Sequence, residues 1–126
     1  MTVSKSKPAP GVTAPKEIVI EGMSDAAPTV TNERGAMQSG LPYRFDLVDG
    51  ESIFKMAGVL STGADKYGAN NWHGIPVEDH LNHLIAHAYA WLAGDHSDDH
   101  LSHVMCRAMF AQAVDIHPEW VGKGDP

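Results

Sequence analysis

Residues 76–108 decide the fold, and they read PVEDHLNHLIAHAYAWLAGDHSDDHLSHVMCRA. Pro76 suits the first turn of a helix, where a missing N–H does no harm, and Gly94 suits the end of one. Between these two residues the apolar side chains recur at helical spacing, which predicts a stripe that faces a core. The stripe consists of Leu81, Leu84, Ile85, Ala88 and Leu92.

A further helix is expected from about Asp99 to just before Pro118. Its predicted apolar stripe consists of Leu101, Val104, Met105 and Ala108. The connection between the two helices, residues 95–98, is short, so the helices should pack as antiparallel neighbours. The sequence therefore predicts an antiparallel helical hairpin.

The two helices of this hairpin begin with similar sequences, 20 residues apart. Residues 78–88 read EDHLNHLIAHA and residues 98–108 read DDHLSHVMCRA. The first helix carries His80, His83 and His87 on one strip, about 100° around the helix from its apolar stripe. The second helix carries His100, His103 and Arg107 at the same offsets. We expect these strips to border the core without forming it.

The rest of the chain is predicted to be one preceding helix and an extended arm. Residues 52–60 place Ile53, Phe54, Ala57 and Leu60 at helical spacing, and the helix should end around residues 61–63. Residues 1–40 are poor in apolar side chains apart from the β-prone run at 17–21, and predict an extended or disordered arm. The expected fold is mainly α, with a helical domain at 41–118 and a tail at 119–126.

Composition excludes several classes of protein. A chain of 126 residues that is 43% hydrophobic has room for one modest domain. The formal charge of -7 opposes general nucleic-acid binding, and no apolar run reaches the about 20 residues of a membrane span. The lone Cys106 excludes an intramolecular disulfide framework. We expect a cytoplasmic protein without a membrane partner.

Imidazoles and carboxylates are expected to converge at the turn of the hairpin, where they could bind a divalent metal ion. The predicted group consists of His87, Asp95, Asp98, Asp99 and His103, with His100 as a further member. Mg²⁺ or Mn²⁺ is expected if oxygen ligands dominate, and a softer ion if imidazole does. The alternative is that the histidines cover apolar surface and the carboxylates cap helices. His80 lies about 20 Å from His100 along an antiparallel hairpin, so only a homo-oligomer could join the two ends.

The polar segment after the first helix, residues 64–74, is expected to be a loop that lines a nucleotide site. An ammonium suits phosphate, amides suit a base edge or a ribose, and an aromatic ring can stack on a base. The residues concerned are Lys66, Tyr67, Asn70, Asn71 and Trp72, and Arg44 could reach the same site. The alternative is a structural loop that Tyr67 and Trp72 anchor to the core.

These segments together resemble a known family. Gly63-Ala-Asp-Lys-Tyr-Gly68, Asn71-Trp72, Leu81-Asn-His83, Ala90-Trp-Leu-Ala-Gly94 and Leu101-Ser-His103 are similar to the phage and prophage domain named for the N-terminal part of dATP/dGTP diphosphohydrolases. That domain is grouped with the MazG-like, all-α nucleotide pyrophosphohydrolases. The resemblance covers roughly residues 40–115.

The resemblance implies metal-dependent hydrolysis of a deoxypurine triphosphate to a monophosphate and pyrophosphate, in the host cytoplasm if a phage encodes the chain. It implies catalytic roles for His83, Asp95 and His103, and substrate contacts by Lys66, Asn71 and Trp72. Two alternatives stay open. The chain could bind a nucleotide without turnover, or it could be a virion or assembly protein whose N-terminal arm holds neighbouring subunits.

Overall fold

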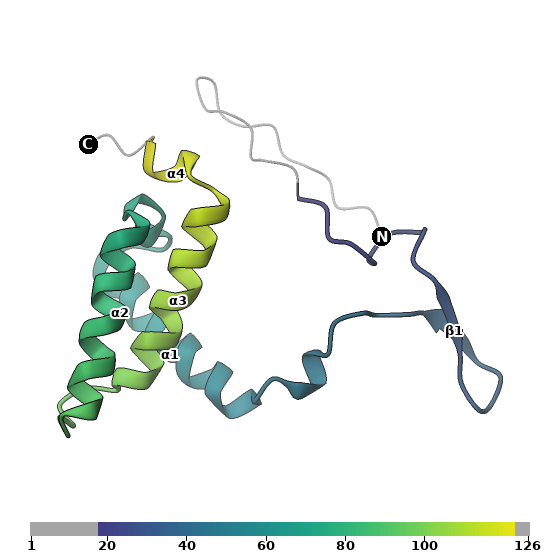
Figure 1. The fold of residues 1–126 in the computed structure, drawn as a ribbon, viewed down its shortest axis with the longest axis horizontal. Helices are drawn as coiled ribbons and strands as arrows, with labels where there is room; N and C mark the ends of the chain where they lie inside the picture. The colour runs from purple at the N-terminus through teal and green to yellow at the C-terminus, as the bar shows by residue number, and fades with distance from the viewer. Residues whose placement is uncertain (1–17, 123–126) are drawn as a thin grey trace. The chain divides into compact units, whose positions relative to one another are not determined.

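A computed structural model describes residues 18–122, which divide into two compact units between Phe45 and Asp46 (Figure 1). The N-terminal unit contains two short antiparallel strands, β1 (Thr29–Thr31) and β2 (Met37–Ser39), with Thr29 opposite Ser39. Residues 18–20 of the β-prone run form no strand. Asn32 shapes the turn, because its side-chain oxygen accepts the backbone N–H groups of Arg34 and Ala36.

The second unit begins with a short 3₁₀ turn, η1 (Phe45–Leu47), at its boundary and then α1 (Gly50–Tyr67). Asp49 caps α1 by accepting the Ser52 N–H at 2.9 Å. The predicted end at residues 61–63 is wrong, because the hydroxyls of Ser61 and Thr62 bond to carbonyls one turn back and stay inside the helix. The helix ends instead at Gly68, whose φ of 95° few other residues adopt.

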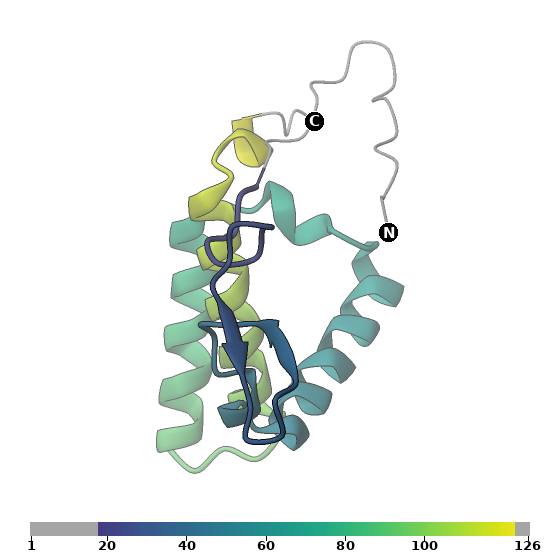
Figure 2. The same cartoon turned by 90° about the vertical axis from the view of Figure 1, so that its right-hand side faces the viewer.

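The predicted hairpin is confirmed: α2 (Val77–Leu92) and α3 (His100–Ile116) lie side by side in both ribbon views (Figures 1 and 2). Gly94 turns the chain with a φ of 89°, and Asp99 caps α3 by bonding to Ser102. A 3₁₀ turn, η2 (Asn71–Gly74), precedes α2. Residues 119–122, which the sequence places in a tail, form the short helix α4 (Glu119–Gly122).

The face that the hairpin helices turn inward is only partly the predicted one, since Leu84, Ala88, Val104 and Met105 are partly buried. The predicted stripe residues Leu81, Ile85, Leu92 and Leu101 are 43 to 69% exposed. The buried side chains of the described residues are instead His80, His100, Ser102, Cys106, Ala111 and Val114. His80 and His87 of α2 therefore face His100 and Arg107 of α3 between the two helices, whereas His83 of the same strip is exposed. Hydrogen bonds across the interface satisfy the buried rings, so their burial costs little.

The predicted apolar face of the first helix is also displaced. Phe54 is 82% exposed, whereas Met56, Val59 and Leu60 are partly buried. The backbone carbonyl of Met56 accepts the Cys106 thiol at 3.4 Å, which joins α1 to α3. None of the helices within residues 18–122 is long and apolar enough to cross a membrane.

Candidate functional site

Three histidines and two aspartates meet at the turn end of the hairpin. His87 Nδ1 lies 3.0 Å from His100 Nδ1, and His100 Nε2 lies 2.6 Å from Asp95 Oδ2. His103 Nε2 lies 3.3 Å from Asp98 Oδ1. The rings of His87 and His103 stack at 4.6 Å with only 8° between their planes. Three separate segments, α2, the turn and α3, thus contribute to one cluster.

The hydrogen bonds of this cluster determine which nitrogen of His87 is free. Hydrogen bonds from Ser97 and His100 lower the pKa of Asp95, so its carboxylate is ionised and accepts the His100 Nε2–H. With both rings neutral, His100 Nδ1 then accepts the His87 Nδ1–H, and the Nε2 lone pair of His87 is left available. Burial lowers the pKa of His87, which favours its neutral form.

A group of three side chains in this cluster, the metal triad, has the donor set and spacing to hold a metal ion. His87, Asp98 and His103 each offer one ligand atom, and these atoms lie within 4.8 Å of one another. The histidines are partly buried, and Asp98 is exposed. Two imidazoles and one carboxylate on a partly open surface suit a divalent transition metal with free coordination positions for water or substrate.

Two carboxylates predicted as metal ligands lie outside the metal triad. Asp95 accepts hydrogen bonds from the Ser97 hydroxyl at 2.6 Å and from His100. Because His100 contacts His87, Asp95 orients the His87 ring indirectly. Asp99 caps α3 through Ser102, and its carboxylate lies 3.7 Å from the ammonium of Lys55. The sequence pattern could not separate these roles, because all three acidic residues occur within one short turn.

The opposite end of the hairpin contains a second polar group around His80, whose side chain is fully buried. A carbonyl can only accept, so His80 Nε2 donates to the Trp72 carbonyl at 3.0 Å. The other ring nitrogen, Nδ1, therefore accepts from the Arg107 guanidinium at 3.0 Å. Burial lowers the pKa of His80, in agreement with a neutral ring.

The residues predicted to bind a nucleotide are not brought together in a single loop. Lys66 and Tyr67 are exposed in the last turn of α1, and the Lys66 ammonium lies 5.2 Å from the Tyr67 ring centre. Asn70, with a φ of 64°, and Asn71 lie between α1 and α2. Arg44 belongs to the N-terminal unit.

Trp72 and His83, two further predicted site residues, differ in exposure: Trp72 is packed against an aromatic ring, and His83 is exposed. Trp72 is partly buried and stacks on Phe110, with ring centres 4.4 Å apart and planes 12° apart. This contact anchors the segment before α2 to α3, as the structural alternative expects of Trp72, whereas Tyr67, the other expected anchor, is exposed. His83 is exposed on α2, one helical turn before His87.

Arg107 and Trp120 are absent from the predicted site, whereas His100 is predicted as a further member of the group at the turn. Arg107 occupies the position equivalent to His87 in the 20-residue repeat, and His100 the position equivalent to His80. The repeat therefore contained a signal for both residues. Trp120 gave no comparable signal, although it lies between the rings of His73 and His117, at 3.8 and 4.3 Å.

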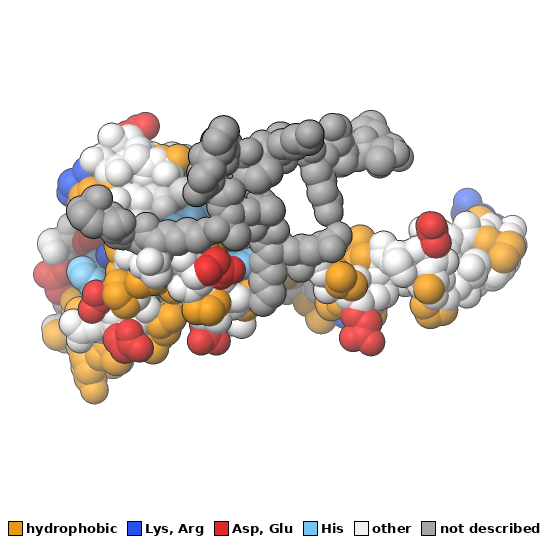
Figure 3. All heavy atoms as spheres, turned by 90° about the horizontal axis from the view of Figure 1, so that it is seen from above, with side chains coloured by type: hydrophobic (Ala, Val, Ile, Leu, Met, Phe, Trp, Pro, Cys, Tyr) orange, Lys and Arg blue, Asp and Glu red, His pale blue; other side chains and the backbone are white. Residues whose placement is uncertain are grey.

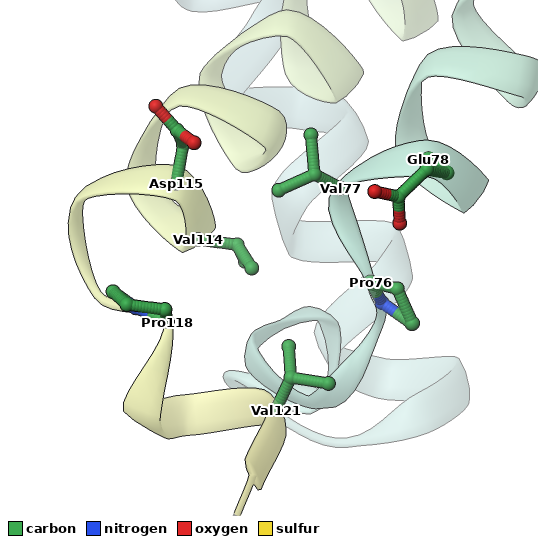
Figure 4. A pocket seen from close by; sticks show the side chains of 7 residues that line it. All are labelled: Pro76, Val77, Glu78, Val114, Asp115, Pro118 and Val121. Carbon is green, nitrogen blue, oxygen red and sulfur yellow. The ribbon is translucent and has the colours of Figure 1, made fainter.

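A shallow apolar hollow of about 190 Å³ lies where α2 begins and α3 ends (Figure 4). Val77, Val114 and Val121 extend into it from three helices, and Glu78 and Asp115 are its charged lining residues. Two carboxylates repel a polyphosphate. This hollow is therefore a poor candidate for a phosphate site.

The comparisons with known proteins point to one family. A family model described as dATP/dGTP diphosphohydrolase, N-terminal, matches residues 31–123. No curated protein and no solved structure matches the chain.

Proposed function

The chain belongs to the dATP/dGTP diphosphohydrolase N-terminal family, and on this basis we propose that it hydrolyses a deoxypurine nucleoside triphosphate with a divalent metal ion. The products are the deoxynucleoside monophosphate and pyrophosphate. The observation that carries the metal dependence is the metal triad of His87, Asp98 and His103. A histidine-rich ligand set favours Mn²⁺ or a softer ion over Mg²⁺.

The reaction adds water to the α-phosphorus and breaks the bond between that phosphorus and the bridging oxygen. A divalent ion held by the metal triad supplies a Lewis acid for the phosphate oxygens. Asp95 and His100 keep the His87 ring in the orientation and tautomer that expose Nε2. The exposed His83, one turn from His87, is the proposed acid–base group that moves the proton between water and leaving pyrophosphate.

The nucleoside part of the substrate is assigned to the end of α1 and the segment that follows. Lys66, Tyr67, Asn70 and Asn71 are exposed there, and offer an ammonium, a phenol and two amides. Trp72 has a different proposed role, since its stacking on Phe110 positions this segment instead of leaving a free face for a base.

The test is release of pyrophosphate from dATP, dGTP, dCTP and dTTP with Mn²⁺, Mg²⁺ or Co²⁺. We expect turnover of the purine substrates with Mn²⁺, none after chelation, and background activity in His103→Ala. The matched control is His96→Ala, which removes an exposed turn histidine outside the metal triad and should leave the rate unchanged. Nucleotide binding without pyrophosphate release would support the non-catalytic alternative, and equal activity of both variants would refute the role of the triad.

We also propose that the protein is a homo-oligomer that associates through the outer face of α2. Residues 80–94 include no Asp, Glu, Lys or Arg, although Leu81, Ile85, Tyr89 and Leu92 are 43 to 69% exposed. On the face seen from above, acidic side chains lie among the hydrophobic ones (Figure 3). From His80 onward α2 carries no formally charged side chain, and an exposed hydrophobic face of this kind is typical of a protein–protein contact.

A further inference from the structure

Arg107 is a partly buried cation that lies between the two polar groups of the hairpin. Its guanidinium contacts the buried His80, a neutral ring that accepts one hydrogen bond. Within residues 18–122, no carboxylate forms an ion pair with it. A guanidinium has five N–H donors, so one bond to His80 leaves most of its capacity unused.

This environment is suited to an anionic ligand. Holding a charge in a partly dehydrated position without an opposite charge destabilises a protein, and an anion that binds there removes this cost. No polar side-chain atom of the described residues is both buried and without a partner, so the Arg107 nitrogens that form no hydrogen bond are not fully buried. These nitrogens are the proposed contacts for the ligand.

The position of Arg107 relative to the metal triad indicates which anion fits. Arg107 follows His103 by four residues on α3, so the two residues lie on one face of the helix, with about 6 Å between their backbone positions along the axis. The ammonium of Lys55 already lies 3.7 Å from the Asp99 carboxylate. Lys66 lies in the last turn of α1, at the opposite end of that helix from Lys55. A chain of phosphoryl groups can contact the metal triad and the guanidinium at the same time.

We propose that Arg107 binds the phosphoanhydride chain of the ligand one helical turn from the metal triad. This inference rests on the proposed function, since it assigns the phosphate end of the same substrate. The planar guanidinium pairs with phosphate oxygens through two N–H groups. His80 and the Trp72 carbonyl hold the guanidinium in place, and His80 is a positioning residue.

The experiment is calorimetric titration of the protein with inorganic pyrophosphate in the presence of Mn²⁺. Arg107→Gln should weaken binding roughly 10- to 100-fold, the range expected for lost hydrogen bonds to a charged group. Arg107→Lys should give an intermediate loss, because a lysine keeps the charge without the two-pronged geometry. The matched control Arg34→Gln removes an exposed cation from the N-terminal unit and should bind as the unaltered protein does.

A second measurement covers the case in which Arg107→Gln does not fold. In the unaltered protein, pyrophosphate and Mn²⁺ should protect Arg107 from phenylglyoxal and leave Arg34 reactive, as read by peptide mass spectrometry. Unchanged pyrophosphate affinity in a folded Arg107→Gln, or equal modification of Arg107 with and without pyrophosphate, would overturn the proposal.

The outcomes also separate this proposal from the proposed function. Arg107-dependent binding of pyrophosphate without hydrolysis of any deoxynucleotide would support the anion site and refute the enzyme. Hydrolysis of dATP or dGTP with an unchanged KM in Arg107→Gln would support the enzyme and refute the anion site.

Discussion

His80 belongs to a histidine strip that the sequence predicts at the border of the core, and the structure places it inside the core. The ring is fully buried, donates to the Trp72 carbonyl and accepts from Arg107. A second proton on Nδ1 would face the guanidinium across a 3.0 Å contact that is now a hydrogen bond. The neutral ring is therefore a structural requirement, and protonation should act against folding.

This requirement predicts acid sensitivity. Burial lowers the pKa of His80 below its unfolded value of about 6.5, and the charges of Arg107 and His83 lower it further. The hydrogen bond to the Trp72 carbonyl and the charge of Asp79 act in the opposite direction but do not reverse the shift. The unfolded chain then binds more protons below pH 6.5, so stability is full above that pH and falls as the pH decreases. The loss from one such group is at most about 1.4 kcal/mol per pH unit.

Urea unfolding between pH 8 and pH 5 measures this effect. His80→Gln keeps a donor and an acceptor but cannot titrate, so its stability should fall less steeply with acid. His96→Gln, an exposed change in the turn, should retain the slope of the unaltered protein. Equal slopes for all three proteins would show that His80 does not contribute.

Asp95 is predicted to act on metal binding through His100 and His87. Asp95→Ala removes the acceptor that orients His100, so the His87 tautomer is no longer set. Metal affinity should fall roughly 10- to 100-fold, as for other groups that orient a ligand. Calorimetric titration with Mn²⁺ or Zn²⁺ measures the change. Asp115→Ala, a carboxylate at the other end of α3, is the control, and a similar loss in both variants would contradict the prediction.

At the scale of elements, the two hairpin helices are positioned by the glycine between them. Gly94 has a φ of 89°, and a Cβ built on it would meet no atom within 4 Å. Gly94→Ala should therefore destabilise the protein through backbone strain alone, by about 1–2 kcal/mol. Gly58→Ala, inside α1 and equally free of contacts, should instead stabilise it by roughly 0.5–1 kcal/mol. Chemical denaturation of both variants tests the opposite signs.

At the scale of the whole molecule, the few buried apolar side chains make self-association important. Cys106, Ala111 and Val114 are the only buried hydrophobic residues in the described part of the chain. Association through the uncharged face of α2 would add apolar burial that one copy lacks. Stability should then rise with protein concentration.

Light scattering coupled to size-exclusion chromatography tests this association. Ile85→Glu places a charge in the middle of the α2 face and should convert the oligomer to a monomer. Phe54→Glu changes a more exposed apolar residue on α1 and should leave the oligomer intact. A monomeric unaltered protein would refute the proposal.

Local signals in the sequence predict the hairpin, its turn and the family, and all three are confirmed. Pro76, Gly94 and the 20-residue repeat are local signals, because a missing N–H, a positive φ and a helical period act within a few residues. The concentration of histidines and carboxylates near the turn could also be predicted, since a short connection forces the helix ends together.

Long-range packing sets which face of each helix is inside and what each histidine does. Leu81 and Ile85 look like core residues and are exposed, whereas His80 and His100 are buried. A histidine can be buried when partners from other elements satisfy both ring nitrogens, and no local pattern reveals such partners. The same reason separates Asp98 in the metal triad from Asp95 behind it, because long-range packing sets the direction in which each carboxylate points.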